Sequence, residues 1–351
     1  MRRLFIAAFR WAVLLVVLHG VPAVLAQTPG PRVLVRYDME GLAGEDDWRM
    51  AAAWWPERYA AGQKLLADDV NAVVAGLFDG GASTVDVWDQ HGSGNPGFDL
   101  PPQLLDHRAR QIGRADTPRV EPGAYDAVAM VGMHAKTGSG GFMAHTGTFG
   151  IDMIVNGRSI TETEFAGYFW GDVGIPVIFV SGDDRLRDDL LPVMPWLEYV
   201  VTKHAISPQA AELRPLDIVR PELREGAKRA LEQRAKAQPL RVATPIRAAV
   251  RAVPPADLSA LKDLPGSNYA DGQVSFQAQS WDQAWRGLVA LQNIAQVMGA
   301  APIIDEILKR DPLWPHIERT REAGFWERWI ALEAERAKNA APRAGRSPRS
   351  N

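Results

Sequence analysis

Cysteine is absent from this chain of 351 residues. Its absence excludes disulfides, thiolate nucleophiles, iron–sulfur clusters and zinc sites built on cysteine. Any metal ion must therefore be bound by histidine, aspartate or glutamate. An excess of positive charge is also lacking, since 39 lysines and arginines face 42 acidic residues and the formal net charge is −3. We expect no nucleic acid partner, because phosphate binding requires clustered positive charge.

The N-terminal segment has no long apolar run. Residues 11–18 form an uninterrupted apolar stretch of only 8 residues, whereas a stable membrane anchor needs about 20. Three arginines stand within the first ten residues, and residues 24–26 form a small-residue cleavage pattern. This combination predicts a signal peptide over residues 1–26 and a secreted or periplasmic protein without a stable membrane anchor. The pattern leaves open whether export follows the general or the twin-arginine route.

Strand-like and helical segments alternate in the first half of the chain. Strands are expected at residues 32–37, 83–88, 126–133, 175–180 and 197–202, and a helix at residues 57–78. Apolar runs such as residues 175–180 are typical of parallel strands that are covered on both faces. We therefore predict an α/β fold, with a mostly parallel open sheet flanked by helices and a smaller C-terminal α+β portion.

The second half has a different character. A charged helix is expected at residues 221–237, strands at 245–253 and 272–279, and a helix from Ser280 that ends at Gly299. The predicted organisation is a signal peptide (1–26), a metal-binding α/β catalytic domain (27–205), an α+β portion (206–336) and a disordered basic tail (337–351). The tryptophans Trp54, Trp55, Trp281 and Trp285 are interpreted as core or subunit contacts rather than as a ligand cage.

Acidic and histidine side chains directly follow three of the expected strands. Asp38 and Glu40 follow the first strand, His91 follows the second and His134 follows the third. The carboxyl ends of parallel strands form the usual ligand crevice of an open sheet, so we expect these side chains to converge. The alternation of an extended chain places Asp38 and Glu40 on one side, with Met39 pointing away.

Carboxylates that converge in a buried site require a positive charge nearby. Two buried carboxylates repel each other and lose hydration unless a cation neutralises them. With two imidazoles added, this oxygen and nitrogen donor set fits zinc or a similar divalent ion. A second ion is feasible if Glu162 or Glu164 approaches, and paired ions are suited to hydrolysis. His145 is interpreted equally well as a proton carrier or as a structural histidine, and Asp183 as a helix cap.

The motifs follow one another in a specific order. They are Asp38-Met39-Glu40-Gly41, Asp89-x-His91, Gly132-x-His134-Ala135, Met143-x-His145, residues 156–158 leading to Glu162, and residues 181–184. Over about residues 32–300 this order and spacing resembles the DppA-type zinc-dependent D-aminopeptidase family. The resemblance implies an aminopeptidase that acts on short peptides with an N-terminal D-residue, of the D-Ala-D-Ala kind, with two zinc ions per subunit.

The resemblance also implies roles for individual residues. Asp38 would bridge the two zinc ions, Glu40 and His91 would complete one site, His134 and Glu162 would complete the other, and His145 would stand near the substrate. The resemblance further implies that the chain assembles as a ring-shaped homo-oligomer. The chain departs from the family where Thr161 stands in place of the usual glycine before Glu162, and Glu164 is a competing acid two residues further on.

Two other functions fit the same residues. The first is another exported metal-dependent amidohydrolase that acts on cell-wall fragments or on L-peptides. The second is a periplasmic protein that binds a metal or a peptide without turnover. Several carboxylates and histidines that converge around an open metal position favour the enzyme.

Overall fold

The structure is a computed structural model that describes residues 29–114, 121–148, 150–254 and 256–310. The predicted signal peptide (1–26) and basic tail (337–351) lie outside the described residues. Among the helices of the described part, none combines the length and the apolar character needed to cross a membrane.

The larger sheet has seven strands in the order β3-β2-β1-β4-β7-β8-β9. Its strands are β1 (Arg32–Tyr37), β2 (Thr84–Asp89), β3 (Arg110–Arg114), β4 (Ala127–Met133), β7 (Val177–Asp183), β8 (Glu198–Ser207) and β9 (Ala210–Leu213). All neighbours pair in parallel except β9, which runs antiparallel to β8. The predicted α/β fold with a mostly parallel open sheet is confirmed.

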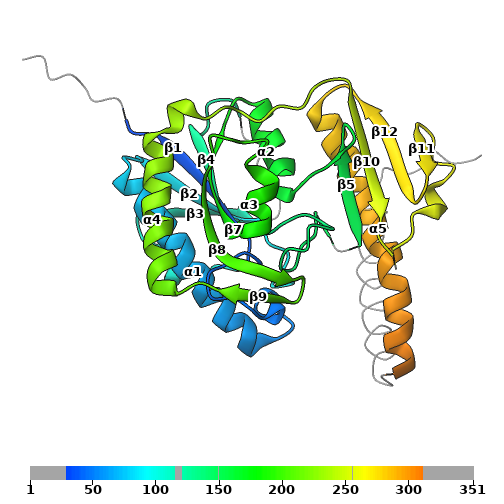
Figure 1. The fold of residues 1–351 in the computed structure, drawn as a ribbon, viewed down its shortest axis with the longest axis horizontal. Helices are drawn as coiled ribbons and strands as arrows, with labels where there is room; N and C mark the ends of the chain where they lie inside the picture. Colours follow the sequence, from blue (N-terminus) through cyan, green and yellow to red (C-terminus); the bar gives the residue numbers. More distant parts are fainter. Residues whose placement is uncertain (1–28, 115–120, 149, 255, 311–351) are drawn as a thin grey trace, which may run out of the picture.

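Helices cover both faces of this sheet (Figure 1). Helices α1 (Pro56–Asp79) and α4 (Leu216–Glu232) pack side by side on one face, and α2 (Glu162–Asp172) and α3 (Asp184–Leu190) pack on the other. Short 3-10 helices occupy residues Trp48–Ala51, Pro102–Leu104, Arg234–Lys236 and Ser259–Leu261. The period of two along β1 divides its side chains between two cores, with Val33 and Val35 facing α1 and Leu34 facing the side of α2.

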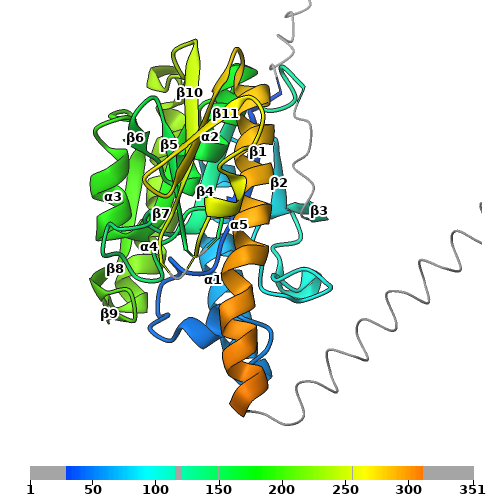
Figure 2. The same cartoon turned by 90° about the vertical axis from the view of Figure 1, so that its right-hand side faces the viewer.

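A second, antiparallel sheet has the strand order β11-β12-β10-β5-β6. Its strands are β5 (Ile151–Val155), β6 (Arg158–Ser159), β10 (Ile246–Ala252), β11 (Ser267–Ala270) and β12 (Gln273–Ala278). The long helix α5 (Trp281–Arg310) packs against this sheet and extends beyond it (Figure 2). The boundary expected near residue 205 does not separate the two sheets, because β5 and β6 precede it and α4, which follows it, packs on the larger sheet.

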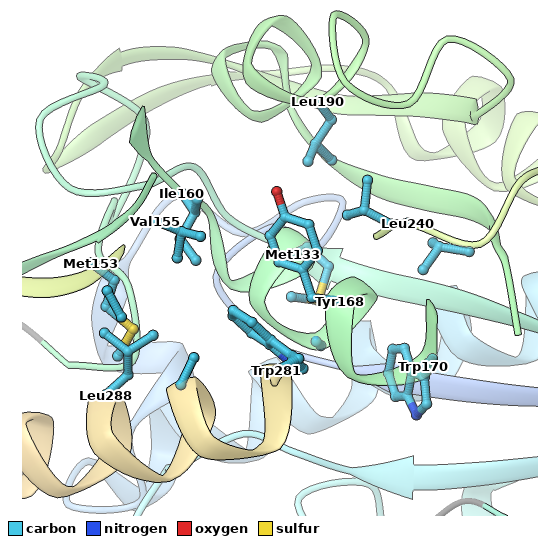
Figure 3. Packing of buried hydrophobic residues seen from close by; sticks show 14 of the residues in the cluster. Met133, Met153, Val155, Ile160, Tyr168, Trp170, Leu190, Leu240, Trp281 and Leu288 are labelled. Atoms are coloured by element: carbon cyan, nitrogen blue, oxygen red, sulfur yellow. The ribbon is translucent and has the colours of Figure 1, made fainter. Parts of the chain in front are cut away.

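The second sheet and the larger sheet share one apolar core around α2 (Figure 3). Trp281 of α5 is buried, and its ring lies 4.9 Å from Tyr168 and 5.6 Å from Phe165 of α2. The interpretation of Trp281 as a core residue is therefore confirmed. This packing holds α2 between the two sheets and thereby positions its first residue, Glu162.

The prediction that the last described helix ends at Gly299 is wrong, because α5 continues to Arg310. A glycine inside a helix costs only about 1 kcal/mol relative to alanine. The two residues that follow it, Ala300 and Ala301, are strong helix formers. One glycine therefore does not end this helix.

Candidate metal centre

The segments that leave β1 and β4 lie against each other. The Asp38 N–H donates to the Val131 carbonyl at 2.8 Å, and the Gly41 N–H donates to the Gly132 carbonyl at 2.8 Å. A Cβ atom on Gly41 would lie 1.9 Å from the Met133 carbonyl oxygen, so only glycine permits this approach. The backbone contact places the carboxylates after β1 beside the residues after β4.

Six of the residues singled out in the sequence meet at this edge of the sheet. Three groups each have potential ligand atoms within 4.8 Å of one another: Asp38, Glu40 and His91; Asp38, His134 and Glu162; and Glu40, His134 and His145. Asp38 belongs to the first two groups, which are the two sets that the family resemblance implies. The structure thus brings together every predicted site residue, while their role as metal ligands remains a prediction.

The distances within the cluster are short for side chains from different segments. The His91 Nε2 lies 3.4 Å from a Glu40 oxygen. The His134 Nε2 lies 3.8 Å from a carboxylate oxygen of Asp38 and 3.7 Å from one of Glu162. Met39 is buried in the opposite core with α1, so the expected alternation of Asp38, Met39 and Glu40 is confirmed.

Hydrogen bonds set the orientation of the imidazoles. The His134 Nδ1 lies 3.0 Å from the Ala135 carbonyl oxygen and the His145 Nδ1 lies 2.7 Å from the Met143 carbonyl oxygen. Because a carbonyl oxygen only accepts, each Nδ1 must carry the proton, and each Nε2 then carries a lone pair when the ring is neutral. The His134 Nε2 is buried and has no hydrogen-bond partner. A buried lone pair beside two carboxylates fits a metal ligand.

Asp99 supports His91 from behind. The His91 Nδ1 lies 3.0 Å from Asp99 Oδ2, and the hydroxyl groups of Tyr59 and Ser93 donate to Asp99 Oδ1. A carboxylate behind a metal-binding histidine fixes its ring and raises its basicity as a ligand. The sequence analysis missed Asp99, which stands in a segment rich in glycine and proline and carries no recognisable motif.

The electrostatics of the cluster call for a cation. Burial and the neighbouring Glu40 raise the pKa of Asp38 well above its usual range. Burial opposes ionisation of Glu40 and Glu162 as well, but nearby histidines outweigh it and lower both pKa values. Burial disfavours the protonated form of His91, yet Glu40 and Asp99 raise its pKa. The three carboxylates therefore need positive charge beside them, and a divalent ion that takes the place of the histidine protons would supply it.

The structure distinguishes Glu162 from Glu164. Glu164 is fully buried in a capping box, where its carboxylate accepts from the Thr161 N–H at 2.9 Å and its own N–H donates to the Thr161 hydroxyl at 3.0 Å. Its other oxygen pairs with Arg158. Glu162 instead accepts from the Gly147 N–H at 2.6 Å and lies in the cluster. Of the two candidates, Glu162 is the one positioned to bind an ion.

Arg36 is a second residue that the sequence analysis missed. It is 4% exposed, and its Nη2 lies 3.2 Å from Glu162 Oε2. This contact holds one Glu162 oxygen in place while the other faces His134 and His145. A charged residue inside the apolar run of β1, on the same face as Asp38, was the available signal.

A cavity of about 680 Å³ opens onto the cluster. Arg36, Asp38, Glu40, His91, His145 and Glu162 form its polar end. Its volume falls within the range of sites that hold small ligands and short peptides. A buried carboxylate and histidine cluster, at the carboxyl edge of a parallel sheet and beside such a cavity, is the arrangement of a metal-dependent hydrolase.

Comparison with known proteins identifies the family. The model of the D-aminopeptidase family matches residues 32–290, and the chain belongs to this family of peptidases. A curated D-aminopeptidase of Bacillus subtilis (strain 168) is 26% identical over 279 residues, which cover 75% of this chain and 97% of that protein. The family resemblance read from the motifs is therefore confirmed, and the chain is an enzyme of the hydrolase class.

A solved structure shares the fold. It is described as the Zn-dependent D-aminopeptidase DppA from Bacillus subtilis, a self-compartmentalizing protease. It superposes with a TM-score of 0.69 at 23% identity, over 76% of this chain and 98% of that chain. The similarity shows that the two proteins share their overall architecture.

Proposed function

We propose that this protein is a zinc-dependent aminopeptidase that removes an N-terminal D-residue from short peptides, with D-Ala-D-Ala as the prototype substrate. The observation that carries the proposal is the pair of buried ligand groups that share Asp38 at the end of a peptide-sized cavity. The D-residue follows from the family, and zinc is supported by the donor set and by the description of the Bacillus relative.

Two ions fit the side chains that are present. Asp38, Glu40 and His91 would hold one zinc ion, and Asp38, His134 and Glu162 would hold the other. When bound, zinc supplies Lewis acidity toward a carbonyl oxygen and lowers the pKa of water. Asp99 and Arg36 would keep His91 and Glu162 in the orientation that binding requires.

His145 is proposed to move the proton. It lines the cavity, and its Nδ1 is committed to the Met143 carbonyl. Burial and the adjacent His134 lower its pKa, which keeps the ring neutral near pH 7. A neutral imidazole accepts a proton at Nε2 and returns it to the leaving amine, as general acid–base catalysis requires.

Export and self-assembly are further parts of the proposal. The N-terminal pattern of arginines, apolar run and small residues supports export to the periplasm or beyond. The description of the Bacillus relative as self-compartmentalizing supports a homo-oligomer, proposed here to be ring-shaped. Expression of the full chain should yield a mature protein that begins after Ala26 and an oligomer by light scattering. A protein that keeps its first 26 residues would contradict the proposed export. A monomer would contradict the proposed self-assembly.

Metal removal tests the catalytic proposal directly. The purified mature protein should contain two zinc ions per subunit, lose cleavage of D-Ala-D-Ala on dialysis against a chelator, and regain it when zinc is added back. Zinc is required because the three carboxylates alone offer no Lewis acid. Metal content and dipeptide release are measured on the same preparation.

Adding a second dipeptide to this assay separates the proposed function from an L-peptide hydrolase and from a binding protein without turnover. L-Ala-L-Ala is the matched control substrate, since it differs from D-Ala-D-Ala only in stereochemistry. Faster release from the L-dipeptide would point to an L-peptide hydrolase. Tight zinc uptake with no hydrolysis of any peptide would point to a binding protein.

A further inference from the structure

Aromatic side chains dominate the wall of the cavity beyond the metal cluster. Six of the 12 tryptophans of the chain line it: Trp48, Trp54, Trp55, Trp88, Trp170 and Trp285. Phe165 and Phe169 of α2 complete this wall. The structure thus places Trp54, Trp55 and Trp285 around a ligand-sized space next to the proposed reaction centre, whereas the sequence suggested core or subunit contacts.

These aromatic residues come from separate parts of the fold and meet in pairs. Trp48 and Trp55, from the segment before α1, have ring centroids 4.6 Å apart at an interplanar angle of 79°. Trp88 and Trp170 approach to 6.2 Å, and Phe169 and Trp285 approach to 6.1 Å. Three edge-to-face or tilted pairs from the β2, α1, α2 and α5 regions therefore surround one space, and each holds its rings in a fixed orientation.

Charge is scarce on this wall. Among the described residues that line the cavity, Arg36 is the one charged side chain besides the three cluster carboxylates, apart from the histidines. Its guanidinium already contacts Glu162. Met143 and Val289 add apolar surface between the rings. A ligand with a charged side chain would find no opposite charge on this wall.

Part of the wall is exposed to solvent. Trp54 is 73% exposed and Trp48 is 42% exposed, whereas Trp88 and Trp170 are buried. A methyl side chain such as that of alanine cannot cover these rings in a space of about 680 Å³. A large apolar side chain would remove them from water and gain both apolar burial and ring–ring contact.

We infer that the preferred substrates are short peptides that carry large apolar side chains, above all aromatic ones, rather than D-Ala-D-Ala itself. The inference rests on the proposed function and specifies its substrate class. The metal cluster acts on the peptide bond, while the aromatic wall selects the side chain that accompanies it.

The experiment compares dipeptides on the zinc-loaded mature enzyme. D-Phe-D-Ala and D-Ala-D-Phe test an aromatic side chain at either position, D-Ala-D-Ala is the small reference, and D-Lys-D-Ala tests size without apolar character. We expect kcat/KM for the better phenylalanine dipeptide to exceed that for D-Ala-D-Ala and D-Lys-D-Ala by at least about tenfold, as apolar burial of one ring predicts.

Two variants connect this preference to the wall. Trp54→Ala and Trp285→Ala should each lower one ratio several-fold: kcat/KM for the better phenylalanine dipeptide divided by kcat/KM for D-Ala-D-Ala. Trp54 is largely exposed, so its truncation leaves folding intact. Ile218→Ala is the control variant. Ile218 is 48% exposed on α4, which covers the face of the larger sheet opposite α2 (Figure 1). The ratio for this variant should equal that of the parent.

The possible outcomes separate this inference from the proposed function. If no dipeptide is cleaved in the presence of zinc, the proposed function itself fails. If cleavage depends on zinc but D-Ala-D-Ala is cleaved as fast as the phenylalanine dipeptides, only the substrate inference is overturned. If Trp54→Ala changes the subunit number by light scattering and leaves the ratio unchanged, the tryptophans are subunit contacts and the inference is overturned as well.

Discussion

Replacing His134 by alanine is expected to remove metal from one of the two proposed positions and to lower peptide cleavage at least about a thousandfold, equivalent to about 4 kcal/mol of transition-state stabilisation. The reason is the buried Nε2, which has no hydrogen-bond partner and lies between Asp38 and Glu162. The measurements are zinc content by elemental analysis and kcat/KM on a D-dipeptide.

A surface histidine provides the control for this variant. The side chain of His204 is 49% exposed on β8 and pairs with Asp184, and it takes no part in the cluster. His204→Ala should retain two zinc ions and the parental rate. Full metal content and full activity in His134→Ala would reject the assignment of the metal centre.

Replacing Lys203 by methionine should destabilise the fold by about 3–5 kcal/mol, the cost of leaving one partner of a buried ion pair alone. Lys203 is completely buried, and its ammonium donates to the Glu40 carbonyl at 2.8 Å and to Glu45 at 3.2 Å. Burial raises the pKa of Glu45 to about 7 even though Lys203 lowers it. Urea unfolding at pH 8, where the Glu45 carboxylate of the parent protein is charged, measures the loss.

Two further variants distinguish the lost pair from lost packing. Lys228→Met removes a half-exposed lysine whose contact with Glu232 spans 4.0 Å, and it should change stability by less than about 0.5 kcal/mol. Adding Glu45→Gln to Lys203→Met should recover part of the loss, because the unpaired charge is then gone. If the free energy of unfolding of Lys203→Met lies within about 1 kcal/mol of the parental value, the ion pair does not stabilise this part of the site.

The sequence predicted the parts of the site that depend on local geometry. Asp38 and Glu40 lie on one side and Met39 on the other, as the alternation of β1 predicted, although the chain has already left the strand for a turn at these residues. Asp183 accepts from the Leu186 N–H at 2.8 Å and caps α3, as its position after an apolar run indicated. Such relations are set within a few residues and can be read from the sequence.

Other features needed contacts between distant segments. Helix α2 was not predicted, and the choice between Glu162 and Glu164 depends on it. The Glu164 side chain is engaged in the capping box with Thr161. The packing of Trp281 against Tyr168 fixes the helix so that Glu162 lies in the cluster. Asp99 and Arg36 likewise acquire their roles only through His91 and Glu162, which lie 8 and 126 residues away in the chain.

The amino-acid sequence by itself determined the donor chemistry of this protein: without cysteine, any metal must bind to carboxylates and imidazoles, and those residues follow strands that period and apolar runs reveal. The tertiary structure decided which of them meet and what surrounds them. Local alternation fixes the direction of a side chain relative to its own strand. Only the tertiary structure brings six tryptophans, three of them from the core around α2 and three from the segment before α1, to the same cavity as the cluster. Long-range packing involves partners that no local pattern specifies, so the aromatic wall was visible only in the fold.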